Sequence, residues 1–93
     1  MVIGKLSLRL MIPGAHSLKD KRRALRSIKD RLASRYNVSI AEVDAQDVWQ
    51  TAVLAVCAVG SERAYVQGLL EKVITLVQSN RHVVLGRCDM EFV

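Results

Sequence analysis

The chain has 93 residues, of which 51% are apolar and 25% are charged, and its formal net charge is +5. This length suits one domain, and so high an apolar fraction excludes an intrinsically disordered chain. The longest uncharged run, Val48 to Ser61, is too short to cross a bilayer, and the first residues lack the regions of a signal peptide. We therefore expect a single cytoplasmic domain over residues 1–93 that does not bind a membrane.

The positive charge is concentrated in one segment. Residues 16 to 35 contain eight basic and two acidic side chains, whereas the rest of the chain contains six basic and seven acidic ones. The whole basic excess therefore lies in this segment. Such clustering is typical of a surface that meets an anion.

The first third of the chain predicts a strand followed by a helix. Residues 2 to 12 alternate between apolar and polar side chains, as in a half-buried strand, and Pro13-Gly14 ends this pattern. Ser17 and Asp20 have the spacing of a capping box, which predicts the start of a helix. The helix then carries an apolar stripe, formed by Leu18, Leu25, Ile28, Leu32 and Tyr36.

The middle of the chain predicts two further strands. Residues 38 to 47 predict a weaker strand, with a bulge near Ala41-Glu42 where the apolar parity changes. Asp44 to Trp49 predicts a hairpin connection. Val48 to Val59 is apolar at both odd and even positions, which is typical of a central strand that is covered on both faces.

The remaining residues complete an α+β pattern. Ser61 predicts the cap of a second helix, which Asn80 ends, and residues 82 to 93 predict a last strand. The order βαββαβ with right-handed crossovers gives a two-layer sandwich with ferredoxin-like topology. Both helices cover one face of a four-stranded antiparallel sheet, in which the first and third strands are central.

The other face of the predicted sheet has no cover within the chain, although the third strand is apolar there as well. Monomers rarely expose an apolar face of this kind, and symmetric pairing is its commonest remedy. We expect a homodimer, joined through this face or through a strand edge. The predicted interface residues are Trp49, Val53 and Ala55.

Three stretches carry a resemblance to a known family: IPGAHSLKDKR (12–22), NVSIAEVD (37–44) and QDVWQ (46–50). The chain resembles the YlxP-like family of small bacterial proteins of unknown function, over essentially its full length. The resemblance implies a ferredoxin-like fold and a cytoplasmic bacterial protein. Members of the family are often encoded beside translation initiation factor two and ribosome-binding factor A, which implies work near the ribosome. It implies neither a catalytic activity nor a cofactor.

The segment from Pro13 to Arg23 is the strongest site candidate. Basic side chains crowd the first turns of the predicted helix, where the helix dipole disfavours each cation by about 0.3–1 kcal/mol. Free backbone N–H groups at the same end, with Ser17 and His16, suit a phosphate. A solvated basic face, with the stem of Lys21 beside the apolar stripe, explains the same residues without a ligand. The candidate anion- or nucleic-acid-binding residues are His16, Ser17, Lys19, Lys21, Arg22, Arg23, Arg26 and Arg31.

No motif for catalysis or metal binding is recognisable. Cys57 and Cys88 lie on different predicted strands without a C-x-x-C motif, and we expect both to be buried core thiols. His16 and His82 lack the spacing of metal ligands, and the glycines form neither a Walker loop nor a nucleophile elbow. We expect a protein that is not an enzyme and holds neither a cofactor nor a metal.

Two classes of function remain. The first is a non-catalytic binding module that contacts phosphates of ribosomal or other RNA through the basic helix. The second is a dimeric regulatory module that binds a small anionic metabolite at the Pro13–Arg22 loop and the helix N-terminus. RNA contact through bases is the weaker expectation, because Trp49 is the only aromatic residue on the central strands. We expect Trp49 to pack at a hairpin or dimer seam, with a polar-rimmed contact site as the alternative.

Overall fold

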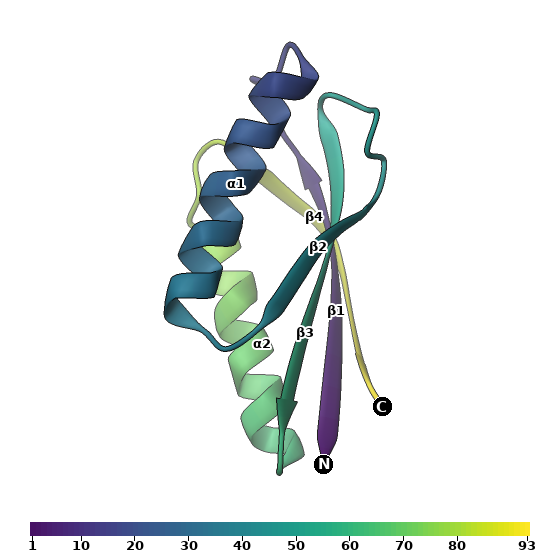
Figure 1. The fold of residues 1–93 in the computed structure, drawn as a ribbon, viewed down its shortest axis with the longest axis vertical. Coiled ribbons are helices and arrows are strands. Elements are labelled where there is room, and N and C mark those ends of the chain that lie inside the picture. Colours follow the sequence, from purple (N-terminus) through teal and green to yellow (C-terminus); the bar gives the residue numbers. More distant parts are fainter.

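The computed structural model describes residues 1–93 and has the predicted order of elements. These are β1 (Val2–Met11), α1 (Leu18–Arg35), β2 (Ser39–Asp44), β3 (Thr51–Gly60), α2 (Arg63–Gln78) and β4 (Val84–Phe92). Figure 1 shows α1 and α2 together on one face of the sheet, with the opposite face bare. The predicted α+β two-layer fold with ferredoxin-like topology is therefore confirmed. Neither helix is long and apolar enough to span a membrane.

The sheet has the strand order β2-β3-β1-β4, and all neighbouring strands are antiparallel. β1 and β3 pair along their whole length, from Val2 opposite Gly60 to Met11 opposite Thr51, which confirms them as the central strands. The predicted bulge in β2 lies between Glu42 and Asp44. The register between β1 and β4 also shifts, near Leu8, which the sequence pattern does not reveal.

The core lies between the sheet and the two helices. Alternate residues of β1, namely Leu6, Leu8 and Leu10, are buried there because side chains of a strand point to opposite faces in turn. α2 packs directly on β1 at Gly4, where an added Cβ would lie only 2.6 Å from the side chain of Val66. Only glycine permits so close an approach. The helices contribute Leu25, Ile28, Leu32, Val66, Leu70, Val73 and Val77 to this core.

The two helices begin in different ways. Ser17 is the N-cap of α1, as predicted, and its Oγ accepts a hydrogen bond from the Asp20 backbone N–H at 3.1 Å. The predicted cap Ser61 does not cap α2. Glu62 holds that position, because its carbonyl accepts the first helical hydrogen bond, from Val66 at 3.2 Å, and its side chain makes no capping bond.

Candidate anion-binding surface

α1 separates its apolar and basic residues onto opposite sides. Its buried side is formed by Lys21, Leu25, Ile28 and Leu32. The exposed side and its margins carry seven cationic residues, which we call the basic face: Lys19, Arg22, Arg23, Arg26, Lys29, Arg31 and Arg35. Lys29 is half-buried, whereas the other six are exposed.

No member of the basic face forms an ion pair with a carboxylate of the protein, although Asp30 is exposed on the same side of α1. The structure contains three ion pairs, Lys5–Glu91, Lys21–Glu42 and Arg87–Asp89, and none of them involves the basic face. Lys19 and Arg31 lie twelve residues apart, which corresponds to about 18 Å along a helix. The positive charge that has no ion-pair partner therefore extends along the helix and is not confined to one spot.

The N-terminus of α1 is capped by residues of the protein itself. The backbone N–H of His16 donates to Asp20 Oδ2 at 3.0 Å, while Ser17 caps the helix through its hydroxyl. The carboxylate of Asp20 thus already supplies the negative charge that the helix dipole favours here. His16 and Ser17, predicted as anion-binding residues, precede α1, and the free positive groups are the side chains of the basic face.

Lys21 does not belong to the basic face, and its assignment to the anion-binding residues is wrong. Its side chain is only 1% exposed, and its Nζ lies 2.7 Å from Glu42 Oε2. The same ammonium donates to the carbonyl oxygens of Ala45 at 2.6 Å and of Val48 at 2.8 Å. A third, longer hydrogen bond reaches the carbonyl of Gln46 at 3.5 Å, so the three donors of the ammonium are all used within the protein. The sequence itself indicates that Lys21 is buried, because residue 21 falls on the same side of the helix as Leu25.

The predicted interface residues lie in two different places. Val53 and Ala55 are on the bare face of the sheet, where their partners on β1 are Arg9 and Ser7. Trp49 precedes β3 instead of starting it, and it lies half-exposed in the loop of residues 45–50. The contacts of Lys21 with this segment hold it as a loop, which the continuous apolar pattern of the sequence does not show.

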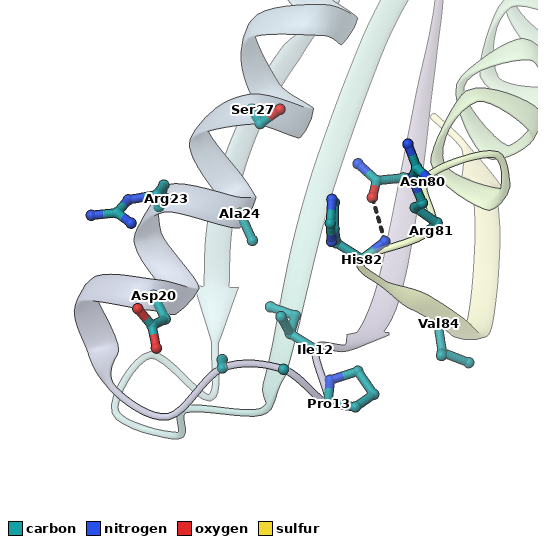
Figure 2. A pocket seen from close by; sticks show the side chains of 12 residues that line it. Ile12, Pro13, Asp20, Arg23, Ala24, Ser27, Asn80, Arg81, His82 and Val84 are labelled. Carbon is teal, nitrogen blue, oxygen red and sulfur yellow. Dashed lines mark hydrogen bonds between the residues drawn. The ribbon is translucent and has the colours of Figure 1, made fainter.

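A cavity of about 530 Å³ opens between the β1–α1 connection, the first turns of α1 and the turn after α2. Figure 2 shows Asn80 and His82 across this cavity from Ala24 and Ser27 of α1. The Asn80 side chain accepts a hydrogen bond from the His82 backbone at 2.8 Å, which shapes the turn. Sequence reasoning missed this turn as part of a site, because only the tertiary fold brings it to α1. The charged and polar lining consists of Asp20, Arg23, Ser27, Asn80, Arg81 and His82.

The cysteines lie apart and differ from the expectation of two buried thiols. Cys57 pairs with Lys5 and Cys88 with Leu8, so the two side chains are on opposite faces of the sheet. Cys57 is half-buried, and Cys88 is exposed because it lies on an edge strand that α1 does not reach. Partial burial raises the pKa of the Cys88 thiol, and the carboxylate of Asp89 adds to this rise. No group of three or more His, Cys, Asp or Glu side chains is placed to hold a metal ion.

The fold and this surface define a small ferredoxin-like α+β domain with one strongly basic helix. The family model described as "Protein of unknown function (DUF503)" matches residues 3–90, so the chain belongs to the DUF503 family. The chain is also similar to "Uncharacterized protein YlxP" of Bacillus subtilis (strain 168), with 36% identity over 78 residues. The match covers 84% of this chain and 85% of that protein. The resemblance to the YlxP-like family is confirmed.

Proposed function

We propose that the protein is a non-catalytic RNA-binding module whose basic face contacts phosphates. The observation that carries this proposal is the set of seven cationic side chains on one 18-residue helix, none of them in an ion pair. Phosphate contacts supply essentially all of the affinity of proteins for nucleic acid that does not depend on base sequence. The gene neighbourhood implied by the family resemblance makes ribosomal RNA the first candidate.

Folding stability alone does not account for this helix. The pairs Lys19/Arg23 and Arg22/Arg26 place like charges four residues apart, and each pair costs about 0.2–0.5 kcal/mol. The first turn adds Lys19 at the helix end where the dipole opposes a cation. An anionic partner offsets these costs. A partner with many charges suits the basic face better than a small anion, because the charges extend along several turns.

Co-sedimentation with purified ribosomes at two salt concentrations tests the proposal. We expect the protein to pellet with ribosomes at about 50 mM salt and to be released at about 200 mM, because binding to phosphates displaces counterions. A titration with ribosomal RNA should show the same steep dependence of affinity on salt. Failure to bind at low salt, or binding that is equally tight at both concentrations, would contradict the proposal.

The cavity supports a second candidate, a dimeric regulatory module that binds a small anionic metabolite. Arg23, Arg81 and His82 line the cavity together with apolar residues such as Ile12. Its volume lies within the range of about 300–1,000 Å³ that is usual for ligand pockets. This site adjoins the Pro13–Arg22 loop, but it draws two of its three basic residues from the turn after α2.

Arg81 separates the two candidates because it lines the cavity and lies outside the basic face. Replacement of Arg81 by glutamine should leave ribosome binding unchanged if RNA is the ligand. If the cavity is the site, a nucleoside monophosphate should raise the melting temperature of the parent protein, since a ligand that binds only the folded state stabilises it. The R81Q variant should then lose this shift. Absence of any shift in the parent would contradict the second candidate.

A further inference from the structure

The loop between β2 and β3 displays an apolar surface beside the start of α1. Trp49, the only tryptophan of the chain, is 51% exposed, although tryptophan is highly buried on average in folded proteins. Val43 and Val48 of the same hairpin are 54% and 50% exposed. No element of the chain covers this cluster. The exposure of Trp49 therefore calls for a partner outside the chain.

Both residues that flank Trp49 are tied to the β1–α1 region. On one side, the carbonyl of Val48 accepts a hydrogen bond from Lys21 Nζ at 2.8 Å. On the other side, the backbone carbonyl of Gln50 accepts a hydrogen bond from the Ile12 backbone N–H at 2.9 Å. The side-chain amide of Gln50 also donates to the carbonyl of Ala15 at 3.1 Å. The backbone on both sides of Trp49 is therefore held in place by hydrogen bonds, and the half-exposed indole projects from a fixed segment of the loop.

The burial of the Lys21 ammonium indicates that the protein stabilises this particular conformation of the loop. A lysine ammonium that is removed from water loses its hydration, and its partners must compensate for the loss. Here the compensation comes from Glu42 and from loop carbonyls, including that of Ala45, whose φ of 57° is left-handed. A connection between two antiparallel strands requires neither a buried lysine nor a left-handed residue such as Ala45, because a turn of two residues is sufficient.

We propose that Trp49 is a stacking platform for an RNA base, and that it makes the basic face selective for single-stranded RNA. This inference rests on the proposed function and deepens it. Lys19 and Arg22 flank Lys21 along α1, and Figure 1 shows the β2–β3 loop beside the first turns of that helix. The loop therefore lies at the end of α1 where the basic face begins, and a strand whose phosphates contact Lys19 and Arg22 passes near it. Every base has a flat face that stacks on an aromatic side chain.

The charges on the loop favour a base over a phosphate at Trp49. Asp44 and Asp47 are both exposed, so they repel phosphates from the loop and leave the phosphates to α1. An uncharged base meets no such repulsion. The bases of a duplex are already stacked and paired, and Trp49 reaches only a base that is free. Selectivity for single strands follows from this.

Tryptophan fluorescence tests the inference directly, since Trp49 is the only tryptophan of the chain. We expect oligouridylate to quench this fluorescence at low salt, whereas a duplex of the same length with oligoadenylate binds without quenching. If the single strand and the duplex both bind without quenching, the inference is overturned and the proposed function is left intact. Quenching by oligoglutamate, together with no binding of RNA in either form, would overturn both and indicate an acidic protein partner.

Substitutions separate stacking from electrostatics. Trp49→Ala should weaken oligouridylate binding about tenfold or more but leave its salt dependence unchanged, because the phosphate contacts remain. Trp49→Phe should retain most of the affinity, which guards against a loss of folding in the alanine variant. The matched control is Tyr65→Ala, which removes an exposed aromatic side chain from α2. Equal affinity of W49A and Y65A would contradict the platform, and failure of the parent protein to bind RNA would contradict the proposed function as well.

Discussion

Lys21 shows how a single residue in a basic segment takes a structural role. The position of Lys21 on the helix carries its stem into the core, and its ammonium then joins α1 to the β2–β3 loop through Glu42, Ala45 and Val48. Glu42 Oε2 is buried and accepts no hydrogen bond in the protein, so the ion pair with Lys21 is its only polar contact. The charge of Glu42 therefore depends on Lys21, whereas the ammonium of Lys21 also has the loop carbonyls.

Lys21→Met should lower the free energy of unfolding by about 3 kcal/mol, because it leaves the carboxylate of Glu42 largely buried without its partner. The side chain of Glu42 is 17% exposed, which keeps the loss at the lower end of the usual range. Urea unfolding followed by circular dichroism measures this loss. The matched control Arg22→Met, one residue along and exposed, should change stability by less than about 0.5 kcal/mol. Equal stability of K21M and R22M would contradict the structural role of Lys21.

Cys88 should react with thiol reagents only at high pH. Its pKa lies above its ordinary value of 9.0, chiefly through desolvation and secondarily through Asp89. The folded state therefore favours the neutral thiol, and the stability that this contributes is present at neutral pH and is lost as pH rises through the folded pKa. In a Cys57→Ser background, we expect the midpoint of alkylation above pH 9.0. Asp89→Asn should lower the midpoint only in part, and a parent midpoint below 9.0 would refute the prediction.

At the scale of elements, local sequence patterns predict the regular parts of the fold. The alternation of residues 2 to 12 and the stripe through Leu25 follow from strand and helix periods, which operate without tertiary contacts. The start of β3 could not be predicted in this way. Val48 and Trp49 continue an apolar run, yet a lysine 28 residues before Trp49 helps hold them in a loop. The turn at His82 was missed for the same reason, because its place beside α1 depends on the whole topology.

The starts of the two helices provide a paired test of the capping assignments. Ser17→Ala removes the side-chain oxygen that accepts from the Asp20 N–H, and we expect a loss of about 1 kcal/mol in the free energy of unfolding. Ser61→Ala should cost less than about 0.5 kcal/mol, because Ser61 is exposed and is not the cap of α2. Thermal unfolding of both variants measures the difference. A larger loss for S61A than for S17A would contradict the assignment.

At the scale of the whole molecule, the bare face of the sheet leads us to propose a homodimer. Of the predicted interface residues on this face, Val53 is already buried within the chain and Ala55 is half-buried, whereas Met11 and Val59 are 45% and 56% exposed on the same face. Pairing of two such faces about a twofold axis would remove this apolar surface from water. Light scattering at micromolar concentration should return about twice the chain mass of 10.4 kDa. A measured mass near the monomer value would refute the dimer.

The basic face also differs from the molecule as a whole, since the positive charge of the rest of the chain is balanced. Two variants can lower the net charge equally, from +5 to +1, while they act on different surfaces. One changes Lys19, Arg22, Arg23 and Arg26 to glutamine. The control changes four exposed basic residues outside α1, namely Arg9, Lys72, Arg81 and Arg87, to glutamine.

The salt dependence of RNA binding by these two variants is the most direct test of the central claim that α1 contacts RNA phosphates. For the variant with four substitutions on the basic face, we expect association at low salt to be lost, with the slope of log affinity against log salt flattened by up to about four units. The control, with the same net charge, should retain nearly the affinity and slope of the parent. Equal binding by the basic-face variant and the parent would contradict the account, as would an equal loss of affinity in the two variants.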